Sequence, residues 1–310
     1  MRIRPLVALS TVALSGLLLA GCSSAAEPDP TATSASVDLC AAAAESGAAA
    51  EAVTVSGDFG AEPTVTFAEP TEVAAIERKV VTEGTGDQIQ SGDLVSFAVV
   101  AYDAETGEKL GSAGFEEGTA LPTQVTAEGN GQFFGCATVG TRFVLALPGS
   151  DDAAAQINVV DVLGITPAAA WGEEQAPVDG MPTVTLADDG TPTVTIPDTD
   201  APTELELAVL KKGDGLVVED GDAVLVQYTG WSWDTKENFD SSWSRGQPSS
   251  FSVAEGSVYE GFRQAIIGQA VGSQVLVVMP PELGDTSGDL KGQTLVFVVD
   301  ILAVQHATSD

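Results

Sequence analysis

The chain has 310 residues and carries 12 Lys and Arg against 45 Asp and Glu, a formal net charge of −33. This charge argues against binding to nucleic acid phosphates or anionic lipid headgroups. A single histidine, His306, and no GxxxxGK[ST] phosphate loop leave no basis for histidine-dependent hydrolysis, a zinc site or nucleotide-dependent transfer. We therefore expect no metal and no cofactor, and we interpret His306 as a solvated tail residue.

Residues 1–21 are expected to be an export signal. Arg2 and Arg4 precede an apolar stretch over 6–21, which is short for a membrane span. The ending LAGC resembles the lipobox of bacterial lipoproteins, which implies cleavage before Cys22 and lipid attached to Cys22. An ordinary cleaved signal and a membrane anchor remain the alternatives. The predicted location is the extracytoplasmic face of the bacterial cell membrane, with the lipid as the sole membrane attachment.

Residues 22–51 are interpreted as a flexible tether and lead-in, because the segment after Cys22 is rich in Ser, Ala, Pro and Thr. The lead-in contains Cys40, and the remaining cysteine is Cys136. An even number of cysteines in an exported protein favours one disulfide, Cys40–Cys136. Two buried free thiols are the alternative.

Internal repetition divides the rest of the chain. EPTVTF at 62–67 corresponds to TPTVTI at 191–196, and SGDLVSF at 91–97 corresponds to DGDAVLV at 220–226. EGTG at 83–86 likewise matches KGDG at 212–215, and all three pairs are offset by 129 residues. A constant offset of this kind predicts two tandem copies of one domain. TPAAAWGEEQAPVDG at 166–180 is interpreted as the linker between them.

In the second copy, Val224, Val226 and Tyr228 alternate as in a half-buried strand, and β-rich runs occur at 274–279 and 294–304. A short amphipathic helix is indicated over 261–269. Phe262, Ala265, Ile266 and Gln269 would share one helix face and pack on the sheet. Antiparallel strands with one helix place the fold in the α+β class.

Aromatic residues gather around one Asp and one Arg in VQYTGWSWDTKENFDSSWSRGQPSSFSVAEGSVYEGF, residues 226–262. Such a group predicts a dry pocket rather than a nucleophilic site. Catalysis of rotation about an X-Pro bond suits such a pocket. The barrier of about 18–20 kcal/mol comes from amide resonance, so lowering it needs no nucleophile. Exclusion of water and a fit to the twisted peptide would both lower that barrier.

The order of these residues resembles the FKBP-type peptidyl-prolyl cis-trans isomerases over about residues 204–304. The match includes LELAVLKKGDGLVVEDGDAVLVQYTG before the pocket and VGSQVLVVMPPELG and GQTLVFVVDILAV after it. The resemblance implies an antiparallel twisted sheet wrapped on one short helix in each copy. It assigns the proline-enclosing wall to Tyr228, Phe239, Val258, Tyr259 and Phe297. Phe262 would be the floor, where the family usually has Trp.

The same resemblance makes Asp240 the polar anchor, bonded to the Tyr228 hydroxyl and paired with Arg245. It also places Arg245, Phe251, Val258 and Tyr259 among the substrate-binding residues. The backbone N–H of Tyr259 would face a substrate carbonyl, and Phe251 would support the loop before it, although a plain core role is equally open. For Asp240 and Arg245 the alternative is a surface ion pair of little energetic value.

Two positions depart from the family pattern. After PPELG the family usually has Tyr-Gly and a longer loop, whereas Asp285 follows here, so a hydroxyl that would donate to the substrate carbonyl is absent. Ser249 falls where many members carry an aromatic rim residue. We expect both changes to affect affinity and turnover more than the fold.

The repeat offset places Val99, Leu110, Gly111 and Glu116 at the positions of Tyr228, Phe239, Asp240 and Arg245. Residues 52–165 are therefore interpreted as a degenerate, catalytically silent FKBP-like domain. Residues 181–310 would form the isomerase domain, with its core over 204–304 and a short tail.

The predicted function is peptidyl-prolyl cis-trans isomerisation that assists the folding of exported proteins outside the cytoplasmic membrane. Its partners would be proline-containing exported polypeptides, and the resemblance adds a macrolide as a candidate ligand. The alternative is a non-catalytic FKBP-like binding or chaperone module. The acidic surface would keep a tethered protein soluble, and attraction of basic clients is the competing interpretation.

Overall fold

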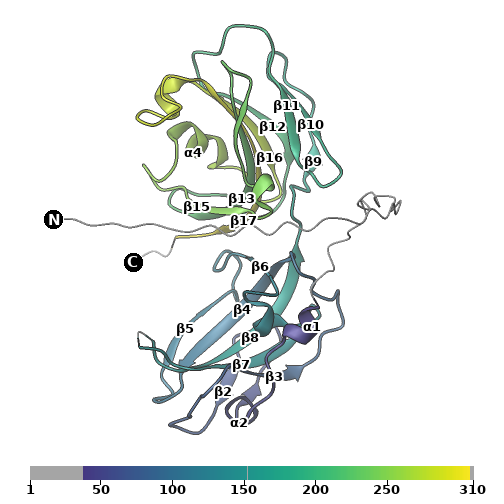
Figure 1. The fold of residues 1–310 in the computed structure, drawn as a ribbon, viewed down its shortest axis with the longest axis vertical. Helices are drawn as coiled ribbons and strands as arrows, with labels where there is room; N and C mark the ends of the chain where they lie inside the picture. The colour runs from purple at the N-terminus through teal and green to yellow at the C-terminus, as the bar shows by residue number, and fades with distance from the viewer. Residues whose placement is uncertain (1–37, 152, 308–310) are drawn as a thin grey trace, which may run out of the picture. The chain divides into compact units, whose positions relative to one another are not determined.

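The computed structural model describes residues 38–151 and 153–307 (Figure 1). The predicted signal peptide, the predicted lipidation site Cys22 and the predicted tether up to residue 37 lie outside these residues. No helix in the described ranges is long and apolar enough to cross a membrane. The same ranges contain no group of three or more His, Cys, Asp or Glu side chains placed to hold a metal ion.

The C-terminal part of the chain forms an antiparallel sheet in the order β14-β13-β17-β16-β12-β9, with β15 also paired to β13. Val dominates its central strands β13, β16 and β17, because β-branched side chains pack well on a pleated surface. The bounds are β9 Glu173–Glu174, β12 Glu206–Lys212, β13 Ala223–Ser232, β14 Asn238–Ser241, β15 Ser249–Ser252, β16 Gln274–Met279 and β17 Leu295–Gln305. The α+β class predicted from the sequence is confirmed.

Both faces of this sheet are covered, as Figure 1 shows. Helix α4, Glu260–Ile266, packs on one face against a core that includes Val226, Phe297 and Val299. The opposite face packs against the hairpin of β10, Thr183–Leu186, and β11, Pro192–Thr195. The strands are therefore apolar on both sides. The pocket lies on the face that packs against α4.

Helix α4 ends earlier than the sequence pattern predicts. Ile267 has an extended backbone and Gly268 has a φ of +82°, so Gln269 does not continue the helical face. Gly268 adopts this left-handed conformation at no steric cost, and its N–H donates to the Val218 carbonyl at 2.8 Å.

Part of the segment predicted as a linker belongs to the C-terminal sheet. Ala170 is buried and its N–H donates to Asp300 Oδ2 at 2.9 Å. Strand β9 follows, and its two glutamates lie opposite Lys212 and Lys211 of β12. Opposite charges directly across a strand pair are favourable, which explains why this short acidic stretch adds an edge strand.

His306 and Ala307, which follow β17, are held more firmly than expected for a solvated tail. His306 Nδ1 lies 2.9 Å from Asp222 Oδ2, and the Ala307 N–H donates to Asp222 Oδ1 at 3.1 Å. Asp222 is buried and thus holds the end of β17 against the start of β13.

The N-terminal sheet has the order β3-β7-β8-β4-β5, with β6 also paired to β4. Strand by strand this order matches β12-β16-β17-β13-β14, with β15 on β13. A second hairpin, β1 with β2, matches β10 with β11. The bounds are β1 Thr54–Ser56, β2 Thr64–Thr66, β3 Glu77–Thr82, β4 Leu94–Asp103, β5 Lys109–Ala113, β6 Thr123–Gln124, β7 Arg142–Leu147 and β8 Gln156–Thr166.

The lead-in before the N-terminal sheet is folded onto both of its faces. Leu39 of α1, Leu39–Ala42, is buried in the core that contains Phe134 of α3, Gly131–Phe134. Ala50 of α2, Ala48–Glu51, packs on the opposite face. Small and branched apolar residues therefore anchor a segment that composition alone suggested was a tether.

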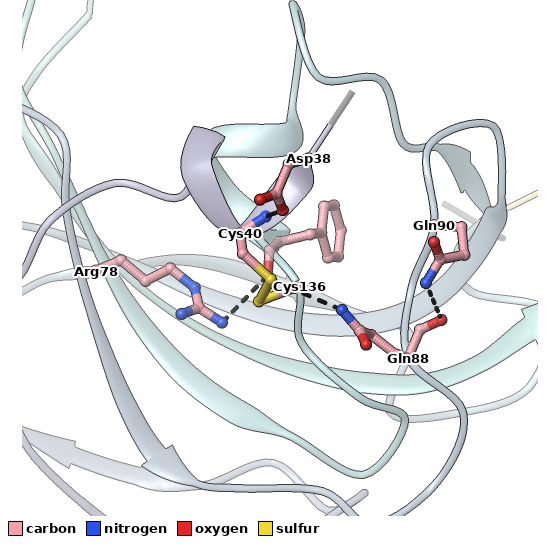
Figure 2. Close-up of a disulfide and its surroundings, with 7 residues drawn as sticks. Asp38, Cys40, Arg78, Gln88, Gln90 and Cys136 are labelled. Atoms are coloured by element: carbon pink, nitrogen blue, oxygen red, sulfur yellow. Dashed lines mark hydrogen bonds between the residues drawn. A yellow bond between two sulfur atoms is a disulfide. The ribbon is translucent and has the colours of Figure 1, made fainter. Parts of the chain in front are cut away.

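A disulfide fastens this lead-in. Cys40 of α1 is bonded to Cys136, which follows α3, and the amide of Gln88 points to the Cys40 sulfur at 3.7 Å (Figure 2). Beside it, Arg78 Nε donates to the Phe133 carbonyl at 2.8 Å. The bridge closes a loop of 96 residues in sequence, so it restricts the unfolded chain strongly.

Replacing both Cys40 and Cys136 with alanine is expected to lower the free energy of unfolding of the N-terminal sheet by about 2–4 kcal/mol. Hydrogen exchange followed by mass spectrometry would measure this as faster exchange in β3, β4, β7 and β8. All four tryptophans lie between residues 171 and 243, so tryptophan fluorescence serves as the control for the C-terminal sheet. Unchanged exchange in the N-terminal sheet would contradict the prediction.

Candidate active site

Three side chains meet beside the C-terminal sheet: Tyr228 from the middle of β13, Asp240 from β14 and Arg245 from the 3-10 turn η1, Trp243–Arg245. The Tyr228 hydroxyl donates to Asp240 Oδ2, and Arg245 Nη1 donates to Asp240 Oδ1. Arg245 Nη2 donates to the Tyr228 hydroxyl at 2.8 Å, and the guanidinium carbon lies 5.4 Å from the Tyr228 ring centre. The cluster is a closed triangle in which each member fixes the other two.

These contacts set the protonation states. Burial alone would raise the pKa of Asp240, but hydrogen bonds from Tyr228 and Arg245 and the guanidinium charge outweigh it and lower that pKa. Burial and the hydrogen bond to Asp240 raise the pKa of Tyr228. At neutral pH, Asp240 is therefore an anion and Tyr228 a hydroxyl donor.

Aromatic rings form the walls of the same region. Phe297 of β17 lies 6.2 Å from the Tyr228 ring, 5.7 Å from Phe262 and 5.5 Å from Phe239. Phe251 lies 5.6 Å from Tyr228 and 6.0 Å from Phe262. Apart from the tilted Tyr228–Phe297 pair, these contacts are edge-to-face, a favourable arrangement for aromatic pairs that keeps the ring positions well defined.

Gly230 allows two of these rings to lie over the β13 backbone. A Cβ built at Gly230 would come within 2.6 Å of the Phe239 ring and 2.8 Å of the Phe297 ring. Any larger residue would push these rings apart, so the glycine is part of the pocket architecture.

Ser242 is a buried positioning residue that the sequence analysis did not identify. The Tyr228 N–H donates to Ser242 Oγ at 2.8 Å, and Ser242 Oγ donates to the Gln227 side-chain carbonyl. These bonds tie the loop after β14 to β13 and so fix the Tyr228 ring. A serine in a Ser-rich loop gives no signal in the sequence that separates it from its neighbours.

A cavity of about 680 Å³ lies over these rings. This volume is in the usual range of small-molecule and peptide sites. Its lining contains the sequence-predicted residues Tyr228, Phe239, Asp240, Phe251, Val258, Tyr259, Phe262 and Phe297. Arg245, expected to contact substrate, does not line the cavity, because its guanidinium is occupied behind the Tyr228 ring. Its place in the structure is that of a positioning residue.

The opposite wall comes from the loop after β16, which the sequence analysis described only by its missing tyrosine. It begins with the 3-10 turn η2, Pro281–Leu283, and Asp285 then accepts hydrogen bonds from three backbone N–H groups. The residues that the loop contributes to the cavity are Glu282, Leu283, Gly284, Asp285, Thr286, Ser287 and Leu290. Asp285 thus closes the short loop on itself beside the pocket.

This arrangement can bind an apolar ring and orient a peptide, but it contains no Cys, Ser-His or Lys nucleophile. Tyr259 caps the start of α4, and its N–H has no acceptor among the described residues, which leaves it free for a bound carbonyl. The remaining chemistry is a change of conformation in a dry, aromatic site.

Comparison with known proteins agrees with this geometry. The family model of the FKBP-type peptidyl-prolyl cis-trans isomerases matches residues 216–302. The chain is 36% identical over 107 residues to the FK506-binding protein of Streptomyces anulatus, which covers 33% of this chain and 86% of that protein. This chain belongs to the FKBP-type peptidyl-prolyl cis-trans isomerase family.

Two further relatives belong to the same family by name. The probable FK506-binding protein of Corynebacterium glutamicum is 36% identical over 104 residues, 32% of this chain and 86% of that protein. FkpA of Escherichia coli, an FKBP-type peptidyl-prolyl cis-trans isomerase, is 36% identical over 109 residues, 34% of this chain and 39% of that protein.

Within this FKBP-type site, the rim at Ser249 is small. Its hydroxyl lies 3.4 Å from Arg245 Nη2, so it extends the polar cluster, and Ser249 does not itself line the cavity.

For a substrate without ionisable groups, we expect kcat/KM of the FKBP-type site to be flat from about pH 5 to about pH 9. The lowered pKa of Asp240 means that its ionic contacts are present above its ordinary pKa and are lost only as the pH falls through a lower value. The raised pKa of Tyr228 keeps its hydroxyl protonated at the alkaline end. A pH–rate profile checks this, and an ionisation inside that window would contradict it.

Proposed function

We propose that this FKBP-type isomerase accelerates prolyl cis-trans isomerisation in exported polypeptides at the outer face of the cytoplasmic membrane. The observation that carries the proposal is the aromatic cavity of Tyr228, Phe239, Phe262 and Phe297 with Asp240 at its edge. The export-signal pattern in residues 1–21 and the Cys40–Cys136 disulfide support this location outside the cytoplasm, since disulfides persist in oxidising compartments.

The proline ring would enter between the aromatic walls, which exclude water from the amide that precedes it. A planar amide is more dipolar than a twisted one, so the dry site disfavours the ground state more than the transition state. The free Tyr259 N–H would hold a flanking carbonyl, and the Tyr228–Asp240–Arg245 triangle would keep the wall rigid. Catalysis then comes from differential binding of the twisted peptide.

We propose further that residues 52–165 are a degenerate FKBP-like domain without isomerase activity. The matching strand orders of the two sheets support this interpretation. At the position of Phe239, Leu110 is 52% exposed instead of walling a pocket. Asn158 lies opposite Ala101 and Leu145, as Phe297 lies opposite Gly230 and Val277, so a buried amide replaces the central aromatic ring.

The lipid anchor at Cys22 is a part of the proposal that can be tested alone. Metabolic labelling with a palmitate analogue in a bacterial host is expected to mark the wild-type chain and not the Cys22→Ala variant. Export of an unlabelled, soluble mature chain would support an ordinary cleaved signal instead.

The folding role is tested with a client whose refolding is limited by a slow prolyl isomerisation, which takes tens to hundreds of seconds unaided. Catalytic amounts of residues 23–310, the proposed mature chain without its lipidated Cys22, are expected to shorten the slow phase. An unchanged slow phase, with the protein present at a tenth of the client concentration, would contradict the folding role.

A non-catalytic binding module is the second candidate, and the loop at Asp285 favours it. That loop presents a carboxylate where a donor hydroxyl would meet the substrate carbonyl, so binding without acceleration is its expected behaviour. Peptide binding with an unchanged isomerisation rate would support this candidate over the first.

A further inference from the structure

The cavity of the C-terminal sheet has walls of unequal charge. Its lining contains four carboxylates and no Lys or Arg. Two of the carboxylates are neutralised within the structure: Asp240 is paired with Arg245, and Glu260 Oε2 lies 2.9 Å from Arg263 Nε. Glu282 and Asp285, both on the loop after β16, form no ion pair among the described residues.

Asp285 is held in its ionised form. Its Oδ1 accepts from the N–H groups of Gly288 at 2.6 Å and Ser287 at 3.0 Å, and Oδ2 accepts from Leu290 at 3.0 Å. These bonds lower the pKa of Asp285, with a further small contribution from the charge of Lys291. A carboxylate offers about four acceptor positions, so one on Oδ2 has no donor among the described residues. Asp285 is largely buried, and it lines the cavity.

The negative charge of this wall reaches the proline-binding region. Burial raises the pKa of Tyr259 first, and the charges of Asp285 and Asp240 raise it further, with no opposing cation. Tyr259 stands at the start of α4 and lines the cavity. The field of the loop therefore extends across the site rather than into solvent alone.

We propose that Asp285 and Glu282 make this site selective for prolyl segments that carry a lysine or arginine beside the proline. The inference rests on the proposed function, because it names the substrate class of the same cavity. An ammonium or guanidinium can donate to the open acceptor of Asp285 and gains from both unpaired charges. An acidic neighbour is repelled by the same two groups.

The selectivity arises at the pocket and not from the net charge of the chain, so a matched control separates the two. Asp214 is exposed, lies outside the cavity lining and makes no ion pair or side-chain hydrogen bond within the described ranges. Asp214→Asn and Glu282→Gln each remove one negative charge from the part of the chain that forms the C-terminal sheet. Glu282→Gln is the cleaner test variant, since Asp285→Asn also weakens a loop-closing bond.

The experiment uses the full mature chain and three peptides that differ only beside the proline, with Lys, Gln or Glu. Protease-free kcat/KM and peptide dissociation constants are measured at low salt and at about 0.5 M NaCl, where charges are screened beyond about 4 Å. At low salt, we expect the Lys peptide to be preferred over the Glu peptide about tenfold in both kcat/KM and affinity. High salt should reduce this preference at least threefold, and so should the double variant Glu282→Gln with Asp285→Asn. Asp214→Asn should leave it unchanged.

Equal values for the Lys and Glu peptides, or an equal effect of Asp214→Asn, would overturn the inference. The Gln peptide reports the proposed function separately, because it carries no charge beside the proline. If no peptide is isomerised, the proposed function fails, and the ratio of dissociation constants still decides the selectivity.

Discussion

Replacing Phe239 with alanine is expected to lower kcat/KM for a Leu-Pro peptide by about ten- to a hundredfold. Phe239 lines the cavity and contacts Phe297 at 5.5 Å, so its removal opens the wall to water and takes away a surface for the proline ring. Loss of one aromatic contact surface is worth about 1.5–3 kcal/mol, and each 1.36 kcal/mol in the barrier is about tenfold in rate. A protease-free peptide assay measures the change.

Leu110→Ala is the matched control for this variant. The repeat places Leu110 at the position of Phe239, but its side chain is exposed on the N-terminal sheet. It is expected to leave the isomerisation rate unchanged. A Phe239→Ala protein that folds and keeps the wild-type rate would remove the aromatic wall from the mechanism, and a loss with Leu110→Ala would place activity in the first sheet.

The largest expected stability effect lies in the N-terminal sheet, at Arg142. Its guanidinium pairs with Asp161 at 2.5 Å and donates to the carbonyls of Gly57, Asp58 and Ala61, which close the hairpin turn of β1 and β2. The two charged side chains are only 4% and 1% exposed. Arg142→Met leaves a buried carboxylate without its partner, which typically costs about 3–5 kcal/mol. This loss of stability is measured by urea denaturation, with hydrogen exchange in β7 and β8 as the readout.

The control is the ion pair of Lys109 and Glu62, whose atoms are 2.6 Å apart but whose side chains are about 40% exposed. Lys109→Met is expected to cost less than about 1 kcal/mol. Because Arg142→Met with Asp161→Leu leaves no unpaired charge, the double variant should recover part of the lost stability. Equal losses for the buried and exposed pairs would contradict the account.

Local patterns were enough to predict the fold class and the main strands of the C-terminal sheet. Alternation at Val224, Val226 and Tyr228 is a property of neighbouring residues, and so is the helix face at Phe262. The early end of α4 had a local signal that the helical periodicity outweighed, since Gly268 stands just past the helix where glycine commonly ends one. The docking of Ala170 depends on Asp300, 130 residues away, and a contact this distant leaves no periodic signal.

In the candidate site, too, some features were predicted from the sequence and others were not. The Tyr228–Asp240–Arg245 group was expected from its family resemblance, and the structure brings the three side chains together. The closure of the loop by Asp285 was not expected, since backbone N–H groups carry no residue-specific signal. Arg245 was placed among the substrate-binding residues, whereas the structure shows its donors used by Asp240 and Tyr228.

Exchange NMR on a Leu-Pro peptide mixed with the mature chain tests the central claim most directly. The account predicts that wild-type protein raises the cis-trans exchange rate far above the uncatalysed rate, and that Phe239→Ala and Asp240→Val each reduce the gain by about tenfold or more. An uncatalysed rate with the wild-type chain, or equal acceleration by folded variants, would contradict it.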